Sequence, residues 1–348
     1  MSDPVGADQD AAFAEDAALI TYFYLRVGII ALVAFLAVAV LRENASRAQT
    51  LSSISASWYT PVQSVFVAVL VAAGVSMIAI RARGVQEPLL NVAGLFAPVV
   101  AFVPTPEPVK VPCFHLPGAA AAAEQLPPPG GRWDPATCVA FVARIDGAVV
   151  PYFWVGSVVL AATLVYVAVR RRNPALEYRP AGGGLMRWLR ERFLEGDVRE
   201  PTRGEEVAGV VVAGVVWVAA IVWYGVGRTS FMDGAHAIAA GAVFLPMALV
   251  AFLAAQTVQR GSTAAARSHG PRARRWAVIA YRVVALAMLL GILATGGMRL
   301  LGWTDDSHHW FWALEWVLLL GFWVFWCVQT FEASIPRLSR KPARDQVI

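Results

Sequence analysis

Long apolar runs bounded by polar residues are the main pattern along this chain. Eight runs cover 19–41, 61–80, 88–103, 149–169, 207–226, 235–258, 276–298 and 309–330. A hydrocarbon core of ~30 Å needs about 20 helical residues to cross it, and lipid leaves no other partner for backbone polar groups. Strict apolar–polar alternation is absent. The pattern therefore predicts an all-α, polytopic membrane bundle of eight transmembrane helices.

The arginine and lysine residues between the runs predict how this bundle is oriented. Counted on alternate sides, 20 basic residues lie on the side that includes both termini and 7 on the other side. Basic loops stay in the cytoplasm, so both termini are predicted to be cytoplasmic. The segments between the spans are then an acidic cytoplasmic segment (1–18), an extracytoplasmic loop (104–148), a basic cytoplasmic loop (170–206) and a basic cytoplasmic tail (331–348). Spans 1–3 occupy 19–103, span 4 occupies 149–169 and spans 5–8 occupy 207–330.

Composition agrees with a membrane location. Hydrophobic residues make up 58% of the 348 residues and charged residues only 15%, which excludes a charged water-soluble surface. The net charge of +5 arises beside the apolar runs, where membrane orientation explains it, so no nucleic-acid partner is predicted. Arginine is far more common than lysine, and Ala, Val and Gly are abundant, as in GC-rich bacterial genomes. The predicted location is therefore the bacterial plasma membrane.

Two cysteines lie in the loop that is predicted to be extracytoplasmic. Disulfides persist outside the cytoplasm, and a bond between Cys113 and Cys138 would staple a loop rich in alanine and proline. In the chain-entropy model such a bond stabilises the loop by roughly 3 kcal/mol. We predict this disulfide, with two unrelated thiols as the alternative. Cys327 lies in the last apolar run, where packing is the simplest role.

Basic segments on the predicted cytoplasmic side favour contact with anionic lipid headgroups. In the 170–206 loop, Leu185, Leu189 and Phe193 recur every four residues among arginines, a pattern typical of an interfacial amphipathic helix. A protein-docking helix is the alternative. The segments 267–275 and 337–344 also carry several arginines, which either attract anionic lipid or serve only as orientation signals.

Ionisable residues inside apolar runs are costly, and Glu315 is the one that needs an explanation. Arg26 and Arg282 lie near the cytoplasmic ends of their runs and can extend toward water. Glu315 lies about 9 Å inside the outer end of the last run, so its short carboxylate needs a partner or a proton. Arg282 is about 12 Å away along the membrane normal and is a poor partner. The better candidates form an outer-rim polar cluster with Glu315: Asp233, His236, Asp305, Asp306, His308 and His309.

The outer-rim polar cluster allows three interpretations. His236, His308 and His309 could hold zinc, whose bound water would hydrolyse a lipid ester or amide. Glu315 could instead serve a proton- or cation-coupled transport path, or the cluster could be a satisfied structural network. No ligand spacing is diagnostic, and the chain contains no nucleotide-binding loop, CxxC pair or HExxH motif. The residues therefore define no catalytic group.

Short motifs give the chain a resemblance to a known family. The motifs are SISASWYT (53–60), EPLLNVAGL (87–95), VPT (103–105), DGAHAIAAGAVF (233–244) and an acidic residue in the last run, and the resemblance that they carry covers about half of the chain. They resemble uncharacterised bacterial multi-span proteins that are distantly similar to the DRAM/Frag family. Members of that family span the membrane six times and are tied to membrane and lipid homeostasis. The resemblance implies roles for Ser53, Ser55, Tyr59, Asn91 and His236, but it supplies no reaction.

Residues 104–226 have no counterpart in that resemblance and add two spans, which preserve the predicted orientation. A weaker likeness to ceramidase-like membrane hydrolases lacks their H-x-x-x-H pair on the last helix. The predicted function is to bind or organise lipids or cell-envelope partners through the outer-rim polar cluster. A zinc-dependent lipid hydrolase and a coupled transporter are the alternatives. A homo-oligomer or a membrane-protein partner is left open.

Overall fold

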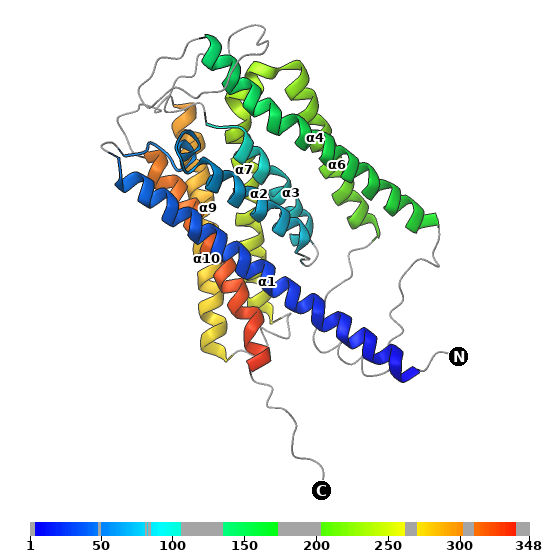
Figure 1. The fold of residues 1–348 in the computed structure, drawn as a ribbon. Helices are drawn as coiled ribbons and strands as arrows, with labels where there is room; N and C mark the ends of the chain where they lie inside the picture. The colour runs from blue at the N-terminus through cyan, green and yellow to red at the C-terminus, as the bar shows by residue number, and fades with distance from the viewer. Residues whose placement is uncertain are drawn as a thin grey trace.

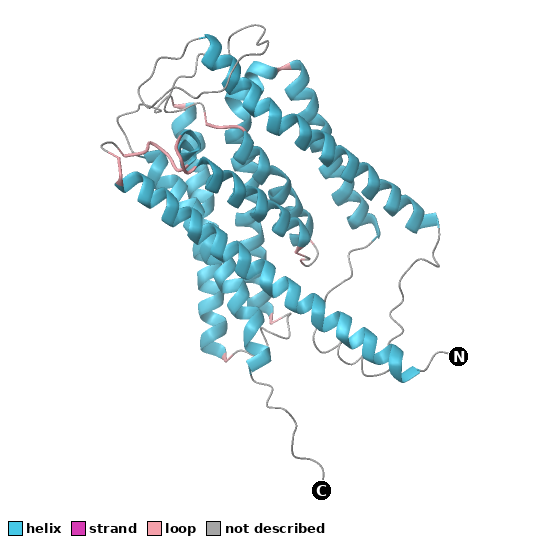
Figure 2. Ribbon diagram, in the orientation of Figure 1, coloured by secondary structure: helices cyan, strands magenta, loops and turns pink. Residues whose placement is uncertain are grey.

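A computed structural model of the protein describes residues 4–47, 50–80, 82, 85–105, 135–172, 203–261, 270–301 and 310–338. Every regular element in these ranges is helical (Figures 1 and 2). The elements are α1 (Pro4–Ala45), the 3₁₀ helix η1 (Ser55–Tyr59), α2 (Gln63–Ala79), α3 (Gln86–Phe102), α4 (Pro135–Arg172), α6 (Arg203–Val226), α7 (Arg228–Arg260), α9 (Pro271–Leu300) and α10 (Trp310–Leu338).

Each of the eight apolar runs lies on its own α-helix, which confirms the all-α class for the described residues. Five helical segments among them are long and apolar enough to cross a membrane: Thr21–Ala45, Val139–Tyr166, Arg228–Arg260, Pro271–Met298 and Trp310–Glu332. Gln63–Ala79, Gln86–Phe102 and Val211–Val226 are apolar but shorter. At 1.5 Å per residue, a 17-residue helix reaches only about 25 Å. The helices fit a multi-span membrane protein, and the count of eight crossings stays a prediction.

Two boundaries differ from those predicted. Helix α1 begins at Pro4, so most of the predicted acidic segment is helical. Helix α4 begins at Pro135, and residues 135–148 are helix where a loop was predicted. Proline is well suited to the first turn of a helix, and Phe141, Ile145 and Val149 then follow at four-residue spacing and are all buried. The charged Arg144 and Asp146 interrupt the hydropathy of this segment without interrupting the helix.

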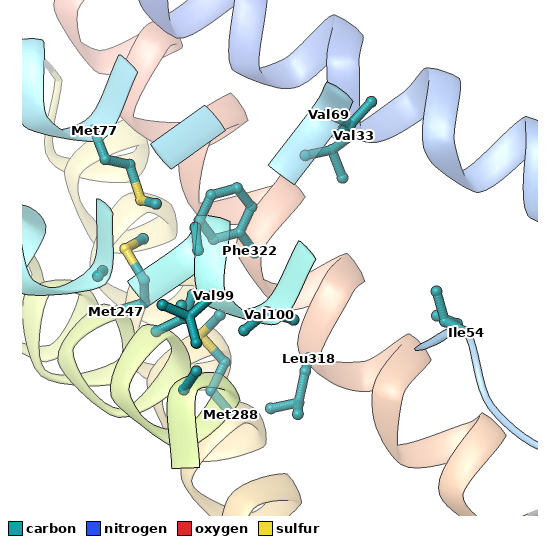
Figure 3. Packing of buried hydrophobic residues seen from close by; sticks show 14 of the residues in the cluster. Val33, Ile54, Val69, Met77, Val99, Val100, Met247, Met288, Leu318 and Phe322 are labelled. Atoms are coloured by element: carbon teal, nitrogen blue, oxygen red, sulfur yellow. The ribbon is translucent and has the colours of Figure 1, made fainter. Parts of the chain in front are cut away.

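The helices pack around α7. Helices α3 and α9 lie against α7, α2 lies against α3, and α10 lies between α1 and α9. The middle of this bundle is apolar, with Met77, Met247, Met288, Leu318 and Phe322 in its core (Figure 3). Figure 1 shows α4 and α6 side by side at the edge of the bundle, and they contact it through α3 and α7.

Helices α4, α6 and α7 are joined near Asp146. The Tyr224 hydroxyl donates to Asp146 Oδ1 at 2.5 Å, and Arg228 forms an ion pair with the other carboxylate oxygen. Phe153 and Phe231 add edge-to-face ring contacts between the same helices. The charge of Asp146, which breaks the hydropathy pattern, is therefore a connection point for three helices.

Helices α2 and α3 approach closely where two glycines face each other. A Cβ atom on Gly74 would lie 2.7 Å from the carbonyl oxygen of Gly94, and a Cβ on Gly94 would lie 2.6 Å from that of Gly74. Helices in a membrane gain from such close contact, because van der Waals packing replaces the hydrophobic drive. These two glycines set the spacing of the α2–α3 hairpin.

Several predicted features lie outside the described residues. They are Cys113, Asp305, Asp306, His308, His309 and the predicted interfacial helix of the 170–206 loop. Cys138 belongs to α4, without a described side chain, and Cys327 is a free thiol. The Cys113–Cys138 disulfide therefore stays a prediction.

Candidate functional site

The segment that joins α1 to α2 is polar and is buried at one end of the bundle. We call this end of the bundle the η1 end. Ser53, Ser55, Ser57 and Thr60 are buried there although all four are polar. The segment folds locally because Ser53 Oγ accepts the N–H of Ala56 at 2.9 Å and the Thr60 hydroxyl donates to the Ser57 carbonyl at 2.8 Å. Serine and threonine commonly stabilise turns through such bonds. SISASWYT is therefore a folded element rather than a flexible linker.

Glu315 on α10 holds this segment through three hydrogen bonds. Its Oε2 atom accepts the backbone N–H groups of Ile54 and Ser55, the latter at 3.2 Å. Its Oε1 atom accepts the Ser55 hydroxyl at 2.8 Å. Hydrogen bonds to an ionised acceptor are stronger than neutral ones, and two adjacent N–H groups form a natural cradle for a carboxylate. A partner was predicted for Glu315 from its place in an apolar run. The partners are the Ser55 hydroxyl and two backbone N–H groups.

His236 on α7 extends the contact to two further elements. Its Nε2 atom lies 2.9 Å from Ser55 Oγ, and its Nδ1 atom lies 2.7 Å from the carbonyl oxygen of Val103 at the end of α3. His236 and Ser55 are each 7% exposed. We call Glu315, Ser55, His236 and the Val103 carbonyl the Glu–Ser–His network. It connects α10, η1, α7 and α3 at a single point.

The hydrogen atoms of the Glu–Ser–His network can be arranged in two complete ways. In the neutral arrangement, protonated Glu315 donates to Ser55, Ser55 donates to His236 Nε2, and His236 Nδ1 donates to the Val103 carbonyl. In the ionic arrangement, both nitrogens of His236 donate and Ser55 donates to the Glu315 carboxylate. Both arrangements contain the same number of protons. A proton can therefore pass between Glu315 and His236 without movement of the heavier atoms.

The end of α3 is closed by side chains from other elements. The last carbonyls of a helix have no partner within it. Here Trp58 Nε1 donates to the Ala101 carbonyl at 3.1 Å, and the Tyr59 hydroxyl donates to the Thr105 carbonyl at 2.8 Å. His236 Nδ1 donates to the Val103 carbonyl. Burial raises the pKa of the Tyr59 phenol, which keeps this donor protonated. The η1 segment thus serves as a cap for α3.

Replacing Tyr59 with phenylalanine is expected to lower the free energy of unfolding by about 1 kcal/mol, the net value of one hydrogen bond. The ring contacts with Trp58 and Phe141 would remain. Tyr24, which is 67% exposed on α1, is the matched control, and Tyr24→Phe should leave stability unchanged. Thermal unfolding in detergent measures both, and equal effects of the two changes would contradict the assigned cap.

The structure brings together only part of the predicted set. Glu315 and His236 of the outer-rim polar cluster meet Ser55 of the resemblance motif, with Ser53 and Tyr59 in the same segment. Asp233 lies one turn before His236 and is half-buried, outside the network. Asn91 lies twelve residues before Val103 on α3, about 18 Å along the helix, so it is not part of this site.

Some partners in the network carry no signal in the sequence. The N–H of Ile54 and the carbonyl of Val103 are backbone groups, which almost any residue type would supply. Trp58 was part of the quoted motif, but its indole donor to α3 depends on a contact across 43 residues. Only the three-dimensional path of the chain reveals these partners.

A second polar group lies at the opposite end of α10. The Tyr281 hydroxyl on α9 donates to Glu332 Oε2 on α10 at 2.9 Å. Leu318, Phe322 and Phe325 are buried between the two ends of α10. The two polar groups are thus separated by an apolar layer.

The geometry of His236 does not suit a zinc ligand. Both of its ring nitrogens are already engaged, by Ser55 and by Val103. A histidine that binds zinc needs one nitrogen directed at the metal. Within the described ranges, no group of three or more His, Cys, Asp or Glu residues could hold a metal ion. His308 and His309 lie outside those ranges.

Comparison of the chain with protein-family models, with curated proteins and with solved structures finds no match. The resemblance to the DRAM/Frag family therefore stays a prediction that these comparisons neither support nor oppose.

Proposed function

We propose that this protein is a non-catalytic membrane protein that binds or organises phospholipids or cell-envelope partners. One observation carries the proposal: each polar atom of the Glu–Ser–His network already has a partner within the protein. A site built for turnover has to leave a reactive group open to its substrate. A network that is complete without a ligand instead acts as a joint that fixes four elements.

The joint supports the proposed function by holding the η1 end in one shape. Asp233 is half-buried one turn from His236, and the Asp305–His309 segment immediately precedes α10 in the sequence. We propose that these residues contact headgroups or partner proteins, while His236 and Glu315 hold the frame. The resemblance to proteins of membrane and lipid homeostasis agrees with such a role.

A serine hydrolase is the second candidate, because the Ser55–His236 distance of 2.9 Å suits a nucleophile and its base. The N–H groups of Ile54 and Ser55 are adjacent, as oxyanion donors often are. Glu315 occupies both of them, however, and leaves no donor for a tetrahedral intermediate.

The apolar layer along α10 gives no support to the coupled transporter, because that function needs a proton path across the bundle.

A fluorophosphonate probe, which labels activated serines, separates the two candidates. Applied to native membranes that contain the full chain, it is expected to leave Ser55 unmodified by peptide mass spectrometry. A serine hydrolase added to the same membranes is the positive control, and Ser55→Ala gives the background. Labelling of Ser55 that disappears in His236→Gln would overturn the non-catalytic proposal and support the hydrolase.

A further inference from the structure

A surface cavity lies at the end of the bundle opposite η1, between α7 and α9. It has a volume of ≈ 440 Å³ and is lined by Phe252, Gln256, Gln259, Arg260 and Arg282. The first four residues come from one face of α7, at the three- and four-residue spacing that aligns side chains on a helix. Arg282 comes from the neighbouring α9. The cavity lining holds two positive charges and no carboxylate.

The two cavity arginines differ from their neighbour Arg274 in what they contact. Arg274 donates to the carbonyls of Val258 and Gln259 and so caps the end of α7. Arg282 donates through Nη2 to Gln259 Oε1 at 2.5 Å, which orients its guanidinium. A guanidinium has five N–H donors, so most remain for a ligand. No carboxylate of the described chain pairs with Arg260 or Arg282.

Both helices continue from the cavity as exposed apolar stripes. On α7, Phe252, Leu249 and Leu245 lead toward the middle of the helix from the cavity end. On α9, which packs against α7, Leu286, Leu290 and Leu293 lead in the same way from Arg282. Each helix therefore carries charged or polar groups at one end of a stripe and hydrocarbon along the rest. This order matches a phospholipid, with a headgroup at the membrane boundary and acyl chains below it.

We propose that this cavity binds the phosphate of an anionic phospholipid, whose acyl chains lie along the two stripes. Guanidinium groups bind phosphate through paired N–H donors, and Gln256 adds a neutral donor. Free phosphate shares the headgroup chemistry but makes no use of the stripes. The proposal rests on the proposed lipid-binding function and names the chemistry and the residues of one site.

The test uses the full chain in detergent, titrated with phosphatidylglycerol and followed by native mass spectrometry. The wild-type protein is expected to retain this lipid in preference to phosphatidylcholine. Arg260→Gln and Arg282→Gln should each weaken retention about fivefold, and the double variant about 25-fold. Arg275→Gln is the matched control, because Arg275 is exposed at the same end but does not line the cavity.

Equal losses in Arg275→Gln and in the cavity variants would overturn the site in favour of general attraction to a basic surface. Undiminished retention in Arg260→Gln, whose side chain makes no bond within the described protein, would also overturn it. Displacement of bound lipid by millimolar inorganic phosphate would show a phosphate site without a role for the stripes. If the wild-type chain retains no lipid of either kind, the proposed lipid-binding function itself fails. The failure of the function can therefore be told apart from the failure of the cavity as its site.

Discussion

Replacing Glu315 with alanine is expected to lower the free energy of unfolding by about 3–5 kcal/mol. The change leaves two backbone N–H groups and the Ser55 hydroxyl without their acceptor, and each buried group left unsatisfied costs about 1–3 kcal/mol. The η1 segment would lose its link to α10, and α3 would lose part of its cap. Thermal or denaturant unfolding of the purified chain in detergent measures the loss.

Glutamine at the same position should cost less than about 1.5 kcal/mol. Its amide oxygen can accept the N–H groups of Ile54 and Ser55, and its NH₂ group can donate to Ser55 in place of a protonated carboxyl. Glu43→Ala is the control, because the Glu43 side chain makes a local ion pair with Arg47, four residues further along the chain, and pairs at this spacing contribute only about 0.3–0.5 kcal/mol. Equal damage from alanine and glutamine would show that the network needs the negative charge. An unchanged free energy of unfolding in Glu315→Ala would show that the Glu–Ser–His network does not stabilise the fold.

Valine in place of Gly94 should destabilise the protein by about 3 kcal/mol, and alanine by about 2 kcal/mol. The added Cβ would lie 2.6 Å from the Gly74 carbonyl oxygen, a backbone atom that cannot rotate away, so α2 and α3 would have to separate. This separation would also shift Val103 and Ala101 relative to the η1 segment. Unfolding in detergent measures the cost, and cross-linking between α2 and α3 measures the altered spacing.

Gly241→Ala on α7 is the matched control for the glycine prediction. A Cβ at Gly241 would meet nothing within 4 Å, so only helix propensity changes. Alanine should leave stability unchanged or raise it by up to about 1 kcal/mol. If Gly94→Ala behaves like Gly241→Ala, the close approach of α2 and α3 does not contribute to stability.

The helical architecture could be predicted from the sequence because long apolar runs have few structural solutions in a membrane. The start of α4 could not be predicted from the sequence, because Arg144 and Asp146 lower the hydropathy of this segment. Its apolar residues Phe141, Ile145 and Val149 are nevertheless buried. The Gly74–Gly94 contact was also missed. Glycine is frequent in this chain, and nothing local marks the pair that faces across two helices.

The candidate site was predicted in part, for a physical reason. Glu315 was identified because a carboxylate inside an apolar run has to be satisfied, and His236 because it lies at the end of another run. Ser55 entered only through the resemblance. The remaining partners are peptide groups of Ile54 and Val103, whose hydrogen-bonding capacity is the same in almost every residue. Depth in the membrane can be read along the chain, but the choice of partner at that depth cannot.

The cap on α3 has a consequence for how the chain is assembled. Helix α3 leaves the ribosome long before α7, and its Val103 carbonyl waits for His236, 133 residues later. The η1 segment waits longer still, because Glu315 follows Ser55 by 260 residues. Early helices of a growing chain are inserted and begin to fold before later ones exist. The contacts that hold the η1 segment and the end of α3 therefore form only after α7 and α10 have been made. The last helix to be synthesised, α10, supplies the carboxylate that fixes the loop between the first two helices.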